Sequence, residues 1–256
     1  MFEPLNLTLL LLAAFVAGSL NAVAGGGSFL TLPALVFVGL PPVVANATGT
    51  VALLPGYLSG AWGFREDLRA PPGLTMARMA TLSLAGGAAG ALLLLVTDDR
   101  TFRILIPWLL LAATALFAIG PAIVRRSRTR TRTLEGSAPS LVRATIGVLL
   151  VSVYGGYFNG GLGILLLALF GLLGQSNLHA ANGSKNVVSA LLTAIAVLVY
   201  AAGGLVAWPH ALVMMVAATA GGYIGARMAR RLPPAVLRTG IVGIGLVMSA
   251  IFFVRG

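Results

Sequence analysis

Long apolar runs that are almost free of charged residues constrain this chain more than any other feature. Each run is close to the 20 or so residues that an α-helix needs to cross a bilayer. They lie at residues 5–20, 43–62, 79–97, 104–119, 187–207 and 236–254. The 256-residue chain is 58% hydrophobic and 9% charged, whereas a soluble domain carries about 25% charged residues. Because one soluble core cannot bury this much apolar surface, the sequence predicts an all-α polytopic membrane protein.

The first apolar run also has a second interpretation, as a signal peptide. The small residues Ala22-Val23-Ala24 follow the run and resemble a cleavage site. The residues before the run, however, include Glu3 and no basic side chain. The run also has a counterpart later in the chain, so we treat it as the first helix.

The net charge of +11 is concentrated in connections between apolar runs. In a soluble protein such a charge would suggest nucleic-acid binding. Here the arginines gather at 125–132 and 227–231, and clusters of this kind mark cytoplasmic loops that lie near anionic lipid. We therefore expect a multi-pass membrane protein, in contact with the lipid bilayer and with no nucleic acid.

An internal repeat divides the chain into two halves. The motif from Ala85 to Ala91, Ala-Gly-Gly-x-x-Gly-Ala, recurs 135 residues later from Ala220 to Ala226. The glycine pairs that begin at Gly25 and Gly160 have the same offset. The repeat predicts three parts: a first transmembrane repeat at 1–124, a basic cytoplasmic linker at 125–140, and a second transmembrane repeat at 141–256.

Each repeat contains about five expected helical segments. Those of the first half lie at about 5–23, 28–40, 43–63, 76–97 and 103–124. Those of the second half lie at about 141–157, 162–174, 183–205, 210–231 and 236–254. The second segment of each half follows a glycine cluster and has roughly 20 Å of helix, which is too short to span about 30 Å of hydrocarbon. We expect these two segments to be broken or re-entrant helices.

Corresponding loops of the two halves differ in charge. Loop 65–78 has three arginines, whereas loop 200–210 has no charged residue other than a histidine. Loop 98–103 contains two aspartates, whereas loop 227–238 has four arginines. Because basic loops face the cytoplasm, the two repeats are predicted to have inverted topology. Inverted repeats with interrupted helices are typical of secondary transporters, which bind substrates near the middle of the membrane.

The glycine clusters are the first candidate substrate-binding segments. Glycine interrupts a helix and lets a ligand approach the backbone, and amide groups at a fresh helix start attract anions. Ser28 is expected to cap such a start. Tight helix packing at glycine is the alternative. The candidates are Asn21, Gly25, Gly26, Gly27 and Ser28 in the first half and Asn159, Gly160, Gly161 and Gly163 in the second.

Polar residues near the start of two apolar segments form the second candidate set. Their amide and hydroxyl donors, with one ammonium group, suit an oxyanion. Lys185 is the only lysine and adjoins an apolar run, where a buried cation costs about 2.5–3.5 kcal/mol. The alternative is that these residues cap helices and that Lys185 extends to the interface. The candidates are Asn46, Thr48, Thr50, Asn182, Ser184, Lys185 and Asn186.

No acidic residue lies inside an apolar run. The six acids are Glu3, Glu66, Asp67, Asp98, Asp99 and Glu135. Cation carriers and proton relays place carboxylates within the membrane, so the sequence favours a small anionic substrate. The chain has no cysteine, which excludes disulfides, thiol catalysis and cysteine-based metal sites. We expect no metal and no cofactor.

Two small-residue faces, Gly86/Gly90 and Gly221/Gly225, are expected to form helix contacts. These contacts would lie within the chain or at the seam of a homodimer.

The stretch from Asn21 to Leu35, Asn-Ala-Val-Ala-Gly-Gly-Gly-Ser-Phe-Leu-Thr-Leu-Pro-Ala-Leu, closely resembles the opening signature of the sulfite exporter TauE/SafE family. The segments 159–163 and 182–186 resemble the second-half counterparts, with Leu162 where the first half has a third consecutive glycine. The resemblance covers essentially the whole chain. It implies a bacterial inner-membrane permease for a sulfur-containing anion, such as sulfite, sulfoacetate or a related sulfonate. The inverted repeat predicts that such a permease works by alternating access, with the two halves moving about a central site.

Two other functions compete with transport. Ser28 with His179 or His210 could supply the nucleophile and base of an intramembrane hydrolase. The sequence around Ser28, however, lacks the Gly-x-Ser-x-Gly elbow, and no membrane acid is present to orient the histidine. A non-transporting scaffold would leave the polar residues without a role. We therefore predict a transporter and not an enzyme.

Overall fold

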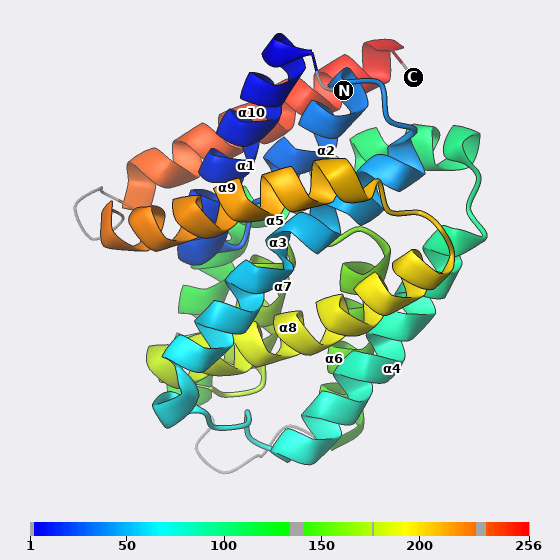
Figure 1. The fold of residues 1–256 in the computed structure, drawn as a ribbon. Helices are drawn as coiled ribbons and strands as arrows, with labels where there is room; N and C mark the ends of the chain where they lie inside the picture. Colours follow the sequence, from blue (N-terminus) through cyan, green and yellow to red (C-terminus); the bar gives the residue numbers. More distant parts are fainter. Residues whose placement is uncertain (1–2, 134–140, 176, 229–233, 256) are drawn as a thin grey trace.

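The fold is a bundle of α-helices (Figure 1). A computed structural model describes residues 3–133, 141–175, 177–228 and 234–255, and none of these residues is in a strand. The elements are α1 (Pro4–Ala24), α2 (Ser28–Phe37), α3 (Pro42–Gly63), the 3-10 helix η1 (Arg65–Asp67), α4 (Met76–Leu95), α5 (Asp99–Thr133), α6 (Leu141–Tyr157), α7 (Leu162–Leu172), α8 (Leu178–Ala202), α9 (Trp208–Met228) and α10 (Pro234–Arg255). The predicted all-α class is confirmed.

Each expected helical segment corresponds to one of these helices, and the largest boundary differences are at the end of α5 and the start of α8. α5 continues to Thr133, through the first part of the expected linker, while residues 134–140 lie outside the described part. α8 begins at Leu178 because the Asn177 side chain caps it, accepting N–H bonds from His179 (2.9 Å) and Ala180 (3.2 Å). The second polar segment, 182–186, therefore lies inside a helix.

Within the described residues, four helices are long and apolar enough to cross a membrane by themselves. The spans are Pro4–Asn21, Met76–Leu95, Asp99–Gly120 and His179–Ala202. Large apolar side chains such as Val96, Leu198 and Val216 point outward and are well exposed. In water such a surface would be unfavourable, but in a bilayer it contacts lipid tails. The chain is a membrane protein.

The helices of the two halves pack in a reciprocal pattern. α1 lies against α9, and the corresponding helix α6 lies against α4 (Figure 1). In the same way α3 packs on α9 as α8 packs on α4, and α5 contacts α7 as α10 contacts α2. Exchanging every helix for its counterpart in the other half leaves this set of contacts unchanged. The halves are therefore interleaved, and neither buries its apolar faces alone.

The corresponding helices α3 and α8 run antiparallel to each other. Near the start of α3, the Thr48 hydroxyl accepts a hydrogen bond of 3.1 Å from the N–H of Ala207, beyond the end of α8. Near the end of α3, Gly60 lies against Asn186 in the first turns of α8. The start of each helix thus adjoins the end of the other.

Two helix crossings depend on glycine. An added Cβ at Gly90 of α4 would overlap the carbonyl oxygen of Val153 in α6. At the equivalent α1–α9 crossing, one at Gly221 would overlap the carbonyl oxygen of Phe15. The expected small-residue contacts within the chain are confirmed at Gly90 and Gly221, whereas the surroundings of Gly225 lie outside the described part.

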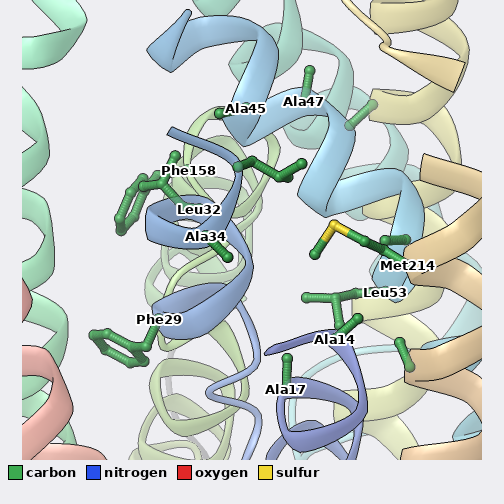
Figure 2. Close-up of a cluster of buried hydrophobic side chains, with 14 of the residues drawn as sticks. Ala14, Ala17, Phe29, Leu32, Ala34, Ala45, Ala47, Leu53, Phe158 and Met214 are labelled. Atoms are coloured by element: carbon green, nitrogen blue, oxygen red, sulfur yellow. The ribbon is translucent and has the colours of Figure 1, made fainter. Parts of the chain in front are cut away.

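The short helix α2 packs against other helices, and most of its side chains are buried or half-buried. Figure 2 shows its side chains in one apolar cluster with side chains of α1, α3 and α9 and with Phe158, between α6 and α7. The labelled residues are Ala14, Ala17, Phe29, Leu32, Ala34, Ala45, Ala47, Leu53, Phe158 and Met214. A broken helix in a membrane is tolerated where protein surrounds it, and this cluster provides those surroundings.

Candidate functional site

Both glycine clusters interrupt the helical backbone, as the sequence predicts. α1 ends at Ala24, and Gly25 adopts the left-handed conformation (φ 79°) before α2 begins. α6 ends at Tyr157, and Asn159 (φ 63°) and Gly161 (φ 71°) turn the chain into α7. Left-handed backbone favours glycine and tolerates asparagine, which explains the residue types at both breaks.

The two breaks lie against each other, and Gly25 and Gly163 are both buried. A Cβ atom built on Gly25 would lie 2.8 Å from the Cα of Gly163. Only two glycines allow backbones to approach so closely. The clusters that the sequence places in different halves therefore form one junction.

Ser28 does not cap α2, so that prediction is wrong. Gly27 occupies the capping position with helical backbone (φ −59°, ψ −35°), whereas side-chain capping needs an extended residue there. Ser28 is the first helical residue and is buried. Its hydroxyl forms no hydrogen bond with a histidine in the described part of the chain, and His179 lies beside Phe64 instead.

Several amides at the two fresh helix starts are already occupied by local turns. The N–H of Phe29 bonds to the carbonyl of Gly26 (3.2 Å), and that of Leu30 bonds to Gly27 (3.1 Å). At the start of α7, the N–H of Ile164 bonds to Gly161 (3.1 Å). Contacts with a bound anion would therefore depend more on side chains than on these amides.

Four buried polar side chains surround the junction, and we call them the junction cluster: Asn21, Tyr57, Asn159 and Thr193. The Tyr57 hydroxyl donates to Oδ1 of Asn159 (3.0 Å), and Nδ2 of Asn159 donates to the Thr193 hydroxyl (3.4 Å). The Asn21 amide lies against Gly56, the neighbour of Tyr57. Its Oδ1 is buried without a hydrogen-bond partner in the described structure. Neutral donors from three helices and from the break between α6 and α7 thus lie close together.

Sequence reasoning selected Asn21 and Asn159 but missed Tyr57 and Thr193. The missed signal is a spacing, since Tyr57 follows Asn46 by 11 residues and Thr193 follows Asn182 by the same number. Eleven residues make three helical turns, so each pair shares one helix face. Without knowing that these faces point at the glycine breaks, Tyr57 and Thr193 read as ordinary core residues.

The structure places the polar residues of α3 and α8 at opposite ends of the antiparallel pair. Asn46 donates to the carbonyl of Tyr157 (2.9 Å), where α6 ends. The Ser184 hydroxyl donates to the carbonyl of Arg69 (2.7 Å) in the α3–α4 loop, as Thr48 binds the α8–α9 loop. Thr50 donates to the carbonyl of Asn46 within its own helix (2.8 Å). The candidate residues of the two helices therefore do not form one cluster.

These residues are not helix caps, because Pro41 and Asn177 precede the first turns of α3 and α8. Lys185 is buried, with 4% of its surface exposed, so it does not extend to the interface. Asn186 is buried against Gly60, and Asn182 is half-buried and has a polar partner. Among the residues with described side chains, no carboxylate pairs with Lys185.

Two acidic residues cap helices away from the junction. The Asp98 carboxylate accepts the N–H of Thr101 (2.6 Å) at the start of α5, and Asp99 accepts that of Val43 (3.0 Å) at the start of α3. Hydrogen bonds from the hydroxyl and then the backbone N–H of Thr101 lower the pKa of Asp98. Helix capping therefore explains the acidic α4–α5 loop.

A cavity of about 670 Å³ lies elsewhere, between α1, α2, α5 and α10. Its lining is apolar except for Arg103, and it includes no residue of the junction cluster. The lining residues are Leu9, Ala13, Leu30, Pro33, Ala34, Val36, Phe37, Pro42, Arg103, Met248, Ile251 and Phe252. This surface suits lipid tails more than a small anion.

Comparison with known proteins agrees with this architecture. A family profile described as "Sulfite exporter TauE/SafE" matches residues 10–252. A probable membrane transporter protein of Haemophilus influenzae is 29% identical over 248 residues, covering 95% of this chain and 93% of that protein. The probable membrane transporter protein YfcA of Escherichia coli K12 is 29% identical over 255 residues, covering 98% and 90%. The chain therefore belongs to the sulfite exporter TauE/SafE family of membrane proteins.

Proposed function

We propose that this protein is a secondary transporter that moves a small sulfur-containing oxyanion, such as sulfite, sulfoacetate or a related sulfonate, across the bacterial inner membrane. The observation that carries the proposal is the contact between the two helix breaks at Gly25 and Gly163. Secondary transporters bind substrates where discontinuous helices meet near mid-membrane. The names of the relatives support transport, and the family's description supports a sulfur oxyanion.

The chemistry of the junction cluster suits an anion. The hydroxyls of Tyr57 and Thr193 and the amides of Asn21 and Asn159 are donors, and no carboxylate lies among them. An oxyanion has several acceptor oxygens, so it would accept hydrogen bonds from these donors once their hydrogen bonds to one another break. A cation would lack the charged partner that it needs in the membrane.

We propose alternating access by two inverted repeats. Reciprocal packing and the antiparallel course of α3 and α8 support an inverted relationship. In this arrangement the halves rock about the junction and open it to each side in turn. Reporter tags at Ala70, in the α3–α4 loop, and Leu205, in the α8–α9 loop, should report opposite sides of the membrane. Signals from the same side would refute the inversion.

The substitution Asn159→Asp tests the substrate site. It keeps the size of the side chain and the left-handed conformation, but it places a negative charge where the anion would bind. We expect flux of radiolabelled sulfite or sulfoacetate in proteoliposomes to fall at least about tenfold, the effect of roughly 1.4 kcal/mol of repulsion.

Asn177→Asp is the matched control, since aspartate also caps helices and Asn177 is exposed. It should transport like the parent protein. Equal flux in the two variants would remove Asn159 from the site. No flux of any tested sulfur oxyanion by the parent protein would refute the proposed substrate class.

A further inference from the structure

A line of buried polar side chains runs along one face of α8. Lys185, Ser189 and Thr193 follow one another at four-residue spacing, which places them on one side of the helix. At most 4% of the surface of any of the three is exposed. We call these residues the α8 stripe. At 1.5 Å per residue it is about 12 Å long.

Two members of the stripe lack the partners that buried polar groups normally have. The Ser189 hydroxyl has no hydrogen-bond partner in the described structure, and Lys185 has no carboxylate partner there. Buried polar groups are nearly always paired, with protein or with water or ligand. Ionisable residues within transmembrane segments face a water-filled pathway or a partner. The unpaired groups therefore mark a place for mobile polar occupants.

The two ends of the stripe connect different parts of the protein. At its outer end, Ser184, the neighbour of Lys185, holds the carbonyl of Arg69 in the α3–α4 loop. At its inner end, Thr193 accepts the hydrogen bond from Asn159 and belongs to the junction cluster. The stripe thus leads from one loop to the proposed binding site.

The first half has no equivalent stripe. With the offset that relates Asn46 to Asn182, the positions that correspond to Lys185 and Ser189 in α3 are Gly49 and Leu53. A Cβ at Gly49 would lie 2.8 Å from the Thr31 hydroxyl, and the Leu53 side chain packs against Gly27. At these two positions α3 therefore has a closely packed glycine and an apolar leucine, where α8 has an ammonium group and a hydroxyl. The two approaches to the junction are therefore chemically different.

We propose that the α8 stripe is the anion-conducting route between the α3–α4 loop and the junction, and that Lys185 selects for negative charge along it. The inference rests on the proposed function for its substrate class. The ammonium group attracts an oxyanion, which then passes the hydroxyls of Ser189 and Thr193. A cation meets an unneutralised positive charge and is excluded.

Because the chain has no cysteine, single-cysteine variants can probe the route directly. We would label Ser189→Cys in proteoliposomes with anionic sulfonatoethyl methanethiosulfonate and with cationic trimethylammonioethyl methanethiosulfonate. After correction for their rates with a free thiol, the anionic reagent should react at least about tenfold faster. Adding Lys185→Gln should reduce this preference about tenfold, because the selecting charge is gone.

Two other positions serve as controls. Ala202→Cys lies at the exposed end of the same helix, so its reaction should show no dependence on Lys185. Leu53→Cys, the position equivalent to Ser189, should remain unlabelled by both charged reagents. Thr193→Cys provides a second probe of the stripe if Ser189→Cys does not yield folded protein by size-exclusion chromatography.

The proposal is overturned if folded stripe variants resist both reagents, or if Lys185→Gln leaves the charge preference unchanged. Labelling requires no knowledge of the physiological anion. If labelling of the stripe is charge-selective but the protein transports neither sulfite nor a sulfonate, the proposed substrate is refuted and the proposed route is still supported. Flux of sulfite with an unreactive stripe would refute the route alone.

Discussion

The backbones of Gly25 and Gly163 touch, so that a Cβ on Gly25 would lie 2.8 Å from the Cα of Gly163. These residues belong to different halves of the chain: Gly25 directly follows α1, and Gly163 lies in the first turn of α7. Their contact brings two interruptions of the helices together at one junction. Beside this junction, the Tyr57 hydroxyl donates a hydrogen bond to the side chain of Asn159.

Gly25→Ala should therefore lower the stability of the protein by more than the cost of placing an alanine in the left-handed backbone conformation. The φ of 79° costs an alanine about 1–2 kcal/mol, and the added methyl group also separates the two breaks. We expect a lower melting temperature in detergent and loss of flux.

Gly204→Ala is the control for this change. Gly204 has a similar φ of 70°, but a Cβ there would meet nothing within 4 Å. The difference between the two variants isolates the junction contact. Equal melting temperatures would show that the close approach of Gly25 and Gly163 contributes no stability.

Tyr57→Phe and Thr193→Val should have coupled effects on stability, because both remove a partner of Asn159. Each single change should cost about 1 kcal/mol, with more for an amide left unpaired. Groups that share one hydrogen-bond network show coupling energies of about 0.5–3 kcal/mol. Unfolding free energies from a double-mutant cycle measure this quantity.

The cycle is repeated with Thr219→Val in place of Thr193→Val. Thr219 is exposed, and its hydroxyl donates to a carbonyl of its own helix. Its combination with Tyr57→Phe should be additive. A purely additive Tyr57–Thr193 pair would argue against a single bonded cluster at the junction.

Gly90→Ala should lower the melting temperature, since its methyl group would overlap the backbone of Val153 where α4 crosses α6. The two helices must separate to accommodate it, and the van der Waals contacts that hold membrane helices together are lost. In contrast, Gly243→Ala in α10 meets no atom within 4 Å. It should leave stability unchanged or raise it by up to about 1 kcal/mol through helix propensity. A neutral Gly90→Ala variant would contradict the tight crossing.

Acidification should weaken the start of α5 through Asp98. The lowered pKa of this carboxyl means that the folded state favours its ionised form. Its stabilisation is therefore complete above the unfolded-chain pKa of about 3.9 and disappears as the pH falls through the lower folded-state value. Between about pH 5 and about pH 3, the melting temperature should fall more in the parent protein than in Asp98→Asn, which does not titrate. Parallel pH curves would exclude this contribution.

The helices themselves could be read from the chain with few errors. Apolar runs and glycine clusters located every described α-helix, because membrane helices need long uncharged stretches and end where glycine frees the backbone. The α8 boundary was misplaced because Asn177 lies outside the apolar run but caps the helix. The Ser28 cap was wrong because the side-chain type alone does not reveal that Gly27 is already helical.

The candidate site was only partly accessible from the sequence. Asn21 and Asn159 stood out because each adjoins a glycine cluster, which is a local property of the chain. Tyr57 and Thr193 had no such local mark, since their role depends on which face of α3 and α8 meets Asn159. Thr48 and Ser184 were chosen as ligands, but their hydroxyls bind loops of the opposite half, a long-range contact with no local signal.

The amino-acid sequence by itself determined the membrane environment, the helical spans and the positions of both helix breaks, because hydropathy and glycine content act over a few neighbouring residues. Only the tertiary structure decided that the breaks meet at Gly25 and Gly163, and that Lys185, Ser189 and Thr193 line one buried face. These relationships arise from the packing of helices far apart in the chain, which depends on how all their surfaces fit together at once.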